Sequence, residues 1–330
     1  MLTADELELF DQQGYVVVDD VLDSNDIDPV AEEYSTALEA AANDLHARGE
    51  LSSTFSDLEF DERYMALLSA NADIFYYLGI SLPLDYGGLA PHLVRAHTGP
   101  ALFGLLSNPK VLDVVESVLG PEISTNPVQQ TRLKPPQRIL SGAMTTYSNV
   151  GATTWHQDFG AVMDEAAGTD MLTVWVAMID TSEEMGCLQV LPGSHRDSEL
   201  SLHCPGKVNP AENYIPQAIL ERHGVDPVPL PVGRGSLVLL NKFTEHSALP
   251  NVSDRLRWSF DLRYQRTGQP TGRPAFPSFV LRSTGQPVAT ADDYHQRWWD
   301  TRESVLSGSH EGPLYEQSRW LANRDNPVCA

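Results

Sequence analysis

The chain has 330 residues, of which 42% are hydrophobic, so it can bury a full core and intrinsic disorder is excluded as its main state. It carries 22 Lys and Arg against 45 Asp and Glu, which gives a formal net charge of −23. Such a field repels the phosphates of nucleic acids and anionic membrane surfaces, so neither is expected as a partner.

The first 120 residues are predicted to be mainly helical. A capping box formed by Thr3 and Glu6 begins a short helix, and residues 15–18 favour a strand. Apolar residues at helical spacing between residues 27 and 45 predict a longer helix. Residues 108–120 carry an N-cap, a proline at the first helical position and a closing glycine, which together predict another helix.

From about residue 122 the pattern changes to strands. Residues 171–179 are nearly all apolar, as in a central strand covered on both faces, and residues 187–191 and 236–240 favour shorter strands. Residues 257–264 alternate in character, which places two sets of side chains on opposite faces: Trp258, Phe260, Leu262 and Tyr264 on one, Arg257, Ser259, Asp261 and Arg263 on the other.

Two long connections rich in proline and glycine, at residues 200–234 and 265–289, are predicted to be lids or disordered loops. A last helix begins after Thr290. Short helices followed by a strand-rich body predict a single α+β domain, mostly β, built on a sandwich or barrel. In this scheme a helical part (1–120) packs on a β core (121–265, with the insert 200–234), and a C-terminal loop and helix (266–330) follow.

The sequence shows no targeting segment and no run of apolar residues long enough to span a bilayer. The three cysteines, Cys187, Cys204 and Cys329, include no C-x-x-C pair and would leave one over if two were bonded. This usage argues against a disulfide framework and a zinc ribbon, and it favours a reducing compartment. We therefore expect a cytoplasmic protein.

His156 and Asp158 are the first candidates for chemistry. In a strand, residues i and i+2 point to the same face, so an imidazole and a carboxylate can converge there and supply two corners of a 2-His-1-carboxylate site. The spacing alone is weak, because a polar pair without function is common and His195 and Asp197 repeat it. His195 follows Pro-Gly-Ser, a turn, so the first pair is favoured.

A third ligand and an anion clamp are available further along the chain. His246 follows an apolar strand, and Arg257 lies eleven residues later with Ser259 on the same strand face. A guanidinium is a planar fork that matches a carboxylate, and a buried one needs an anionic partner. That partner is either an ordinary acidic side chain or one end of a dicarboxylate cosubstrate whose other end chelates a metal.

At this point the sequence resembles the phytanoyl-CoA dioxygenase family of Fe(II)/2-oxoglutarate-dependent oxygenases. The matching segments are the opening residues 1–20 and, within 120–264, residues 155–158, 174–180, 185–195 and 246–259. The resemblance implies a double-stranded β-helix (jelly-roll, cupin-like) core with flanking helices. It also implies that His156, Asp158 and His246 bind iron and that Arg257 binds the distal carboxylate of 2-oxoglutarate, with Ser259 as part of an Arg-x-Ser pattern.

Less specific positions complete the predicted site. Trp175 resembles a family tryptophan that could form a wall beside the cosubstrate, although core packing explains it equally well. Gln130, Arg132 and Lys134 alternate onto one strand face, and they line either the pocket or a solvated sheet edge. No role is predicted for Ser247.

The expected activity is hydroxylation of an unactivated C–H bond in a small-molecule metabolite, with consumption of O2 and 2-oxoglutarate and release of succinate and CO2. Desaturation, cyclisation or epimerisation at the same iron centre is the alternative among enzymes. A non-catalytic, cupin-like metal or small-molecule binding protein is the alternative from another class. Because the net charge repels phosphates, an acyl-CoA ester is not the expected substrate. The oligomeric state cannot be predicted from the sequence.

Overall fold

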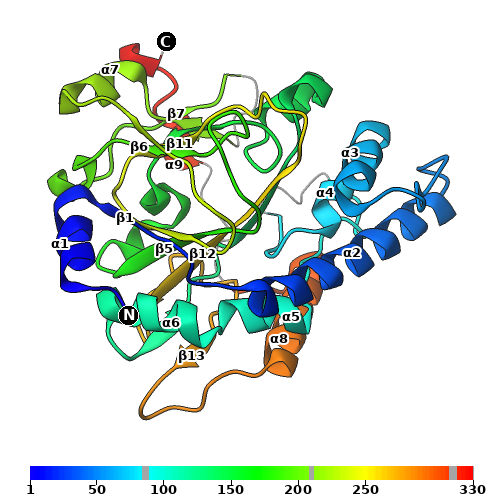
Figure 1. Ribbon diagram of the computed structural model, residues 1–330, viewed down its shortest axis with the longest axis horizontal. Coiled ribbons are helices and arrows are strands. Elements are labelled where there is room, and N and C mark those ends of the chain that lie inside the picture. Colours follow the sequence, from blue (N-terminus) through cyan, green and yellow to red (C-terminus); the bar gives the residue numbers. More distant parts are fainter. Residues whose placement is uncertain (84–88, 208–211, 312–317, 330) are drawn as a thin grey trace.

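The computed structural model describes residues 1–83, 89–207, 212–311 and 318–329 (Figure 1). The α-helices are α1 (Ala4–Gln13), α2 (Ser24–Ala47), α3 (Phe60–Ala70), α4 (Ile74–Tyr77), α5 (Pro100–Leu106), α6 (Pro109–Leu119), α7 (Gln217–Leu220), α8 (Ala291–Ser307) and α9 (Ser318–Leu321). The strands are β1 (Tyr15–Val18), β2 (Ile123–Thr125), β3 (Gln130–Lys134), β4 (Thr153–His156), β5 (Met171–Ala177), β6 (Leu188–Val190), β7 (Cys204–Pro205), β8 (Asn213–Tyr214), β9 (Val228–Leu230), β10 (Leu237–Asn241), β11 (His246–Ala248), β12 (Arg257–Arg266) and β13 (Val280–Arg282).

Two antiparallel sheets form the body of the molecule. The larger has the order β1-β10-β5-β12-β2-β13, with β3 also paired to β12, and the smaller has the order β4-β11-β6-β9. A small apolar core lies between them, to which the larger sheet contributes Trp175 and Val238 and the smaller sheet contributes Val190 and Ala248. β7 and β8 form a separate two-stranded ribbon.

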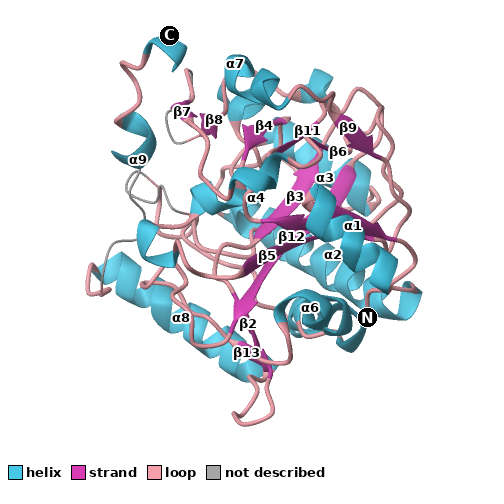
Figure 2. Ribbon diagram, turned by 90° about the vertical axis from the view of Figure 1, so that its left-hand side faces the viewer, coloured by secondary structure: helices cyan, strands magenta, loops and turns pink. Residues whose placement is uncertain are grey.

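The strand β12 separates a helical side from the side that faces the smaller sheet. Phe260 and Leu262 join the large apolar core with Tyr34 of α2 and Val115 of α6, and Figure 2 shows α6 and α8 on the opposite side of the larger sheet from β4, β11, β6 and β9. Arg257, on the other face of β12, is nonetheless buried. The predicted alternation is therefore confirmed, and it directs polar side chains into the space between the sheets.

Most predicted elements are present. The capping box of Thr3 and Glu6 begins α1, and α2, α6, β5 and β12 lie where the periodicity places them. A structureless connection is the expectation for residues 200–234. Instead, this segment contains β7, β8, α7 and β9. The β9 run is short and contains Pro229, so it looks like a loop in sequence; pairing with β6 at the sheet edge makes it a strand.

Cysteine usage argues against a disulfide framework, yet one disulfide is present and Cys187 is left free. Cys204 and Cys329 are bonded, with their Cα atoms 5.5 Å apart and a sequence separation of 125. The C-terminal segment returns to β7 (Figure 1): Asn323 Nδ2 donates to the carbonyl of His203 over 2.8 Å, and the Tyr214 hydroxyl donates to the carbonyl of Cys329 over 3.2 Å. This long-range packing creates the pair, and no spacing motif announces it.

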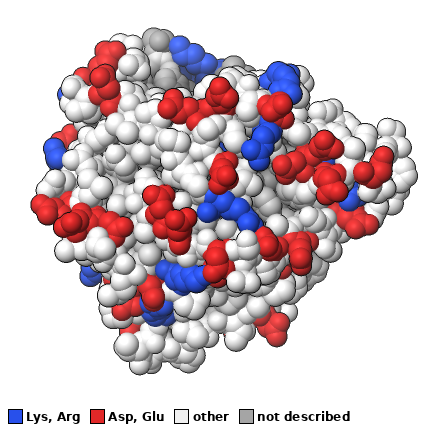
Figure 3. All heavy atoms as spheres, viewed as in Figure 1, with Lys and Arg blue, Asp and Glu red and all other residues white. Residues whose placement is uncertain are grey.

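No helix among the described residues is long and apolar enough to cross a membrane. Acidic side chains are spread over the face of the molecule seen in Figure 3, where they outnumber the basic ones, in keeping with the net charge of −23.

Candidate active site

Three side chains from the smaller sheet and its following turn converge at one end of the space between the sheets. His156 is the last residue of β4, Asp158 begins the 3₁₀ turn η4 (Asp158–Ala161), and His246 is the first residue of β11. The antiparallel register pairs His246 directly with His156, and their ring centroids are 4.2 Å apart. Sheet pairing therefore brings together two histidines that are 90 residues apart.

Both histidines turn the same nitrogen toward the backbone. Nδ1 of His156 lies 2.8 Å from the carbonyl of Thr154, and Nδ1 of His246 lies 2.9 Å from the carbonyl of Thr244. Since a carbonyl only accepts, each Nδ1 donates its proton there, which directs each Nε2 toward Asp158. The two Nε2 atoms lie 3.7 and 3.9 Å from the oxygens of Asp158. Burial lowers the pKa of His156 to about 3, so this ring is neutral.

Asp158 is fully buried and both of its carboxylate oxygens accept hydrogen bonds. Arg263 donates to Oδ1, and the hydroxyl of Thr173 donates to Oδ2 over 2.5 Å. Burial alone would raise the pKa of Asp158, but Arg263 and the two histidines hold it well below its usual value. The group is thus a carboxylate.

This arrangement has the donor set and the spacing of a metal centre. One ligand atom from each of His156, Asp158 and His246 lies within 4.8 Å of the others, and no other group of three or more His, Cys, Asp or Glu side chains among the described residues does so. Two imidazole nitrogens and one carboxylate oxygen on one face suit non-haem Fe(II) and leave other positions open. The other His-x-Asp pair lies elsewhere, since His195 is in η6 (Ser194–Asp197) and bonds to the carbonyl of Asp11.

Arg257 is a buried cation that forms no ion pair with the described residues. Its side chain is 1% exposed, its Nη1 donates to Ser259 Oγ over 3.1 Å, and its Nε has no hydrogen-bond acceptor. It lies 5.6 Å from the ring of Trp175, and no carboxylate of the described residues forms an ion pair with it. Burial lowers the pKa of Arg257 to about 10. A cation in this position fits a ligand carboxylate.

The predicted face of β3 is buried and not a solvated edge; Gln130 and Arg132 line the larger cavity, whereas Lys134 lines neither cavity. Arg132 and Lys134 are buried, and the register of β3 with β12 places Lys134 opposite Arg257 and Gln130 opposite Asp261. Arg132 donates to Asp261 over 2.8 Å. Lys134 donates to Thr153 Oγ1 over 2.5 Å, and burial beside Arg257 and Arg132 holds its pKa well below the usual value.

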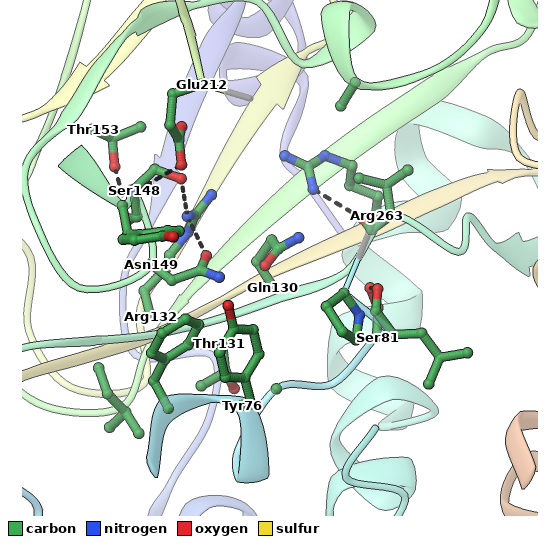
Figure 4. A pocket seen from close by; sticks show the side chains of 18 of the residues that line it. Tyr76, Ser81, Gln130, Thr131, Arg132, Ser148, Asn149, Thr153, Glu212 and Arg263 are labelled. Carbon is green, nitrogen blue, oxygen red and sulfur yellow. Dashed lines mark hydrogen bonds between the residues drawn. The ribbon is translucent and has the colours of Figure 1, made fainter. Parts of the chain in front are cut away.

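Two cavities meet at the His156 and Asp158 side chains. The larger has a volume of about 270 Å³ and is lined on one side by aromatic rings from the N-terminal part and the 140–150 loop: Tyr64, Phe75, Tyr76 and Tyr147. Polar side chains line the rest, and Figure 4 labels several of them, among them Gln130, Arg132, Asn149, Glu212 and Arg263. The smaller cavity, about 10 Å³, lies between His246, Trp175 and Arg257.

Several residues of this site were not predicted from the sequence. Arg263 lies on the same strand face as Arg257, so the alternation of β12 could have revealed it. Thr173 has a similar signal, as a polar residue in an apolar strand. The aromatic wall carries no such signal, because it depends on how α3 and α4 pack. Ser247, for which no role was predicted, accepts from Gln189 over 2.8 Å and lines the smaller cavity.

Comparison with known proteins places these features in one family. A model of the phytanoyl-CoA dioxygenase (PhyH) family matches residues 10–259. A Mus musculus protein named phytanoyl-CoA dioxygenase domain-containing protein 1 is 24% identical over 306 residues, which cover 84% of this chain and 98% of that protein.

Solved structures show the same fold. The non-haem monooxygenase ThoJ in its apo form matches with a TM-score of 0.55 and 17% identity over 91% of this chain and 98% of that one. The non-haem alpha-ketoglutarate-dependent carbocyclase SnoK matches with a TM-score of 0.50 and 16% identity over 96% and 94%. The two antiparallel sheets thus form the predicted double-stranded β-helix.

Proposed function

This chain belongs to the phytanoyl-CoA dioxygenase family of non-haem Fe(II)/2-oxoglutarate oxygenases, and we propose that it hydroxylates an unactivated C–H bond of a small-molecule metabolite, with release of succinate and CO2. The observation that carries the proposal is that a 2-His-1-carboxylate cluster and a buried arginine line the same cavity. This arginine, Arg257, has no carboxylate partner among the described residues. One group fits a metal, and the other fits the far end of a chelating dicarboxylate.

His156, Asp158 and His246 would bind the iron. The hydrogen bonds from the Nδ1 atoms of the two histidines to backbone carbonyls fix the orientation of their rings, and the bonds from Arg263 and Thr173 fix the carboxylate of Asp158. Hydrogen bonds of this kind from neighbouring residues hold metal ligands in place in known metalloproteins. When bound, iron and 2-oxoglutarate would activate O2, which is the oxidant that breaks the substrate C–H bond while 2-oxoglutarate is oxidised to succinate and CO2.

Arg257 and Lys134 would bind the distal carboxylate of 2-oxoglutarate, with Ser259 holding the guanidinium and Trp175 forming one wall. Both cations lie on the face of the larger sheet that adjoins the smaller cavity. This cavity holds about one water molecule, so we expect side chains around it to move apart when the cosubstrate binds. The cost of that movement would be offset by neutralising two buried cations.

The larger cavity would bind the substrate. His156, with a side chain 18% exposed, and Asp158 line both cavities, whereas His246 lines only the smaller one. The open side of the cluster therefore faces the aromatic wall, which excludes water and offers stacking surface for a ring or chain.

The size of the larger cavity supports a small substrate. A volume of about 270 Å³ lies just below the range for pockets that bind drug-sized molecules, about 300–1,000 Å³, and it is too small to enclose an acyl-CoA ester. Arg95 and Arg273 lie in its lining. These cations offset part of the repulsion expected from the net charge, so volume rather than charge supports this limit.

The test is iron-dependent conversion of 2-oxoglutarate to succinate by the full chain, measured by mass spectrometry with and without a panel of small metabolites. We expect the parent to form succinate, to form more with a true substrate, and to add one oxygen atom to it. His156→Ala, Asp158→Ala and His246→Ala should each abolish turnover. A product that has lost two hydrogens would assign desaturation or cyclisation instead. Metal binding without succinate above the His246→Ala level would assign the non-catalytic binding protein.

A further inference from the structure

Arg263 occupies a break in the pairing of β12. Residues Arg257–Asp261 of β12 pair with β3 and residues Tyr264–Arg266 pair with β2, and at the junction the Arg263 carbonyl accepts the backbone N–H of Asn126, directly after β2, over 2.8 Å. The side chain of Gln129 completes this edge: Nε2 donates to the Arg263 carbonyl over 2.8 Å, and Oε1 accepts from the Arg263 N–H over 3.2 Å. The backbone of Arg263 is therefore fixed at a point where the sheet could otherwise open.

The guanidinium of Arg263 is held by two acceptors on different elements. Nη1 donates to the carbonyl of Val128 over 2.9 Å, and Nη2 donates to Oδ1 of Asp158. The side chain is 3% exposed, so solvent does not compete for these bonds. In Figure 4 it lies at one end of the larger cavity, away from Arg132.

The carboxylate of Asp158 is consequently restrained at both oxygens. Thr173, on β5, donates to Oδ2, and Arg263 donates to Oδ1. A carboxylate has about four lone-pair positions, so two donors leave positions for a metal. The same two donors fix the plane of the group while each oxygen stays within 4 Å of one histidine Nε2.

We propose that Arg263 is a positioning residue that holds the Asp158 carboxylate against His156 and His246 in the metal-free protein, so that a divalent cation meets three ligands already in place. This inference rests on the proposed function, because it takes these three residues as the metal ligands. Arg263 does not touch the metal; it acts through Asp158. The charge of Arg263 is needed as well as its hydrogen bond, since Asp158 is fully buried and a neutral donor would leave its charge uncompensated.

The experiment is a titration of the metal-free full chain with Co²⁺, followed by calorimetry and by the visible absorption spectrum of the bound ion. We expect Arg263→Gln to weaken Co²⁺ binding by roughly 10–100-fold, the range found when a residue behind a metal ligand is lost. The Co²⁺ spectrum should change because the carboxylate is no longer fixed. Arg263→Lys, which keeps the charge but loses the bond to Val128, should recover part of the affinity and the parent spectrum.

Two further variants separate charge, hydrogen bonding and general stability. Thr173→Val removes a neutral donor from the same carboxylate and should weaken binding less than Arg263→Gln does. Arg282→Gln removes an arginine that pairs with Asp113 and Glu116 away from the site, and it should leave binding unchanged. Failure of the parent to bind Co²⁺ would contradict the proposed function itself. Parent-like affinity and spectrum in Arg263→Gln, or no recovery in a folded Arg263→Lys, would overturn the role of Arg263 alone.

Discussion

Arg257 and Lys134 are register partners across β12 and β3, and both are buried. Neither forms an ion pair with a carboxylate of the described residues, because the nearby Asp261 bonds to Arg132. Two neighbouring basic side chains that are both shielded from water raise the free energy of the ligand-free protein. A dianionic ligand such as 2-oxoglutarate would lower it, so this pair links cosubstrate affinity to stability.

Arg257→Ala is expected to act mainly on 2-oxoglutarate. A hydrogen-bonded charge pair contributes about 1.5–3 kcal/mol, so the KM for 2-oxoglutarate should rise by roughly 10–150-fold. Arg257→Lys should rescue only part of the loss because an ammonium cannot reproduce the planar fork. Steady-state kinetics at saturating substrate measures the effect, with Arg282→Ala as the control. An unchanged KM in Arg257→Ala would contradict the assignment.

Lys134→Met is expected to weaken cosubstrate binding and to stabilise the ligand-free protein. Replacing a buried charge by an apolar side chain can stabilise by about 1–4 kcal/mol. The pKa of Lys134 is lowered in the folded state. Below about pH 10.4, the ordinary pKa of a lysine, the unfolded chain therefore binds a proton at Lys134 more readily than the folded protein does. The stability of the parent consequently rises with pH up to about that value. The advantage of Lys134→Met should therefore be larger at pH 7 than at pH 9.5.

Urea unfolding of both proteins at the two pH values, without ligand, measures this difference, and calorimetry measures 2-oxoglutarate binding. Equal stability of parent and variant at pH 7 would mean that Lys134 has a compensating anion. Unchanged 2-oxoglutarate affinity would remove Lys134 from the cosubstrate site.

His156 should make the metal-free protein sensitive to mild acid. Burial and the nearby His246 lower the pKa of His156 to about 3, below the unfolded value of about 6.5. The unfolded chain therefore takes up a proton that the folded protein does not, and stability is lost as pH falls below about 6.5. Between pH 7.5 and pH 5.0 the parent should lose up to about 2 kcal/mol more than His156→Gln, an upper value because the ring is 18% exposed.

The comparison is made by urea unfolding with a chelator present, and His295→Gln serves as a control because His295 lies exposed on α8. The control should lose as much stability as the parent. Parallel losses in parent and His156→Gln would show that the folded protein protonates this ring as readily as the unfolded chain does.

Beyond the ligands and the Arg257 role that the family resemblance implies, the sequence predicts the part of the site that depends on local periodicity. The alternation of residues 257–264 is independent of the rest of the fold, so it correctly separates the buried polar face of β12 from its apolar face. The same pattern places Arg263 on the polar face of β12, but it does not predict that Arg263 bonds to Asp158. That Arg263 meets Asp158 depends on where the turn after β4 crosses β12, and this is set by tertiary packing.

The wall of the larger cavity is beyond sequence prediction for a different reason. Tyr76 and Phe75 lie on α4, a helix of four residues with no room for a periodic signal. Tyr147 lies in an irregular segment between β3 and β4. Their position in the lining of the cavity that His156 and Asp158 also line comes from tertiary packing, so the site could be located from the sequence while its selectivity could not.

The bond between Cys204 and Cys329 predicts that a dithiol reductant destabilises the protein. It closes a loop across 125 residues and ties the C-terminal segment to β7, next to His203, which accepts from the N–H of Gln157 over 3.1 Å. Loss of a disulfide typically costs about 2–4 kcal/mol, mainly because the unfolded chain regains freedom.

Urea unfolding should show this loss of stability on reduction of the parent and in Cys329→Ser, while reductant should not destabilise Cys329→Ser further. Co²⁺ affinity should change little, because the ligands lie on β4, β11 and the turn η4, and the pairing of β4 with β11 does not depend on the tether. Detection of the linked peptides in an unreduced digest would establish the pair, and a parent whose stability ignores the reductant would argue that the two thiols are free.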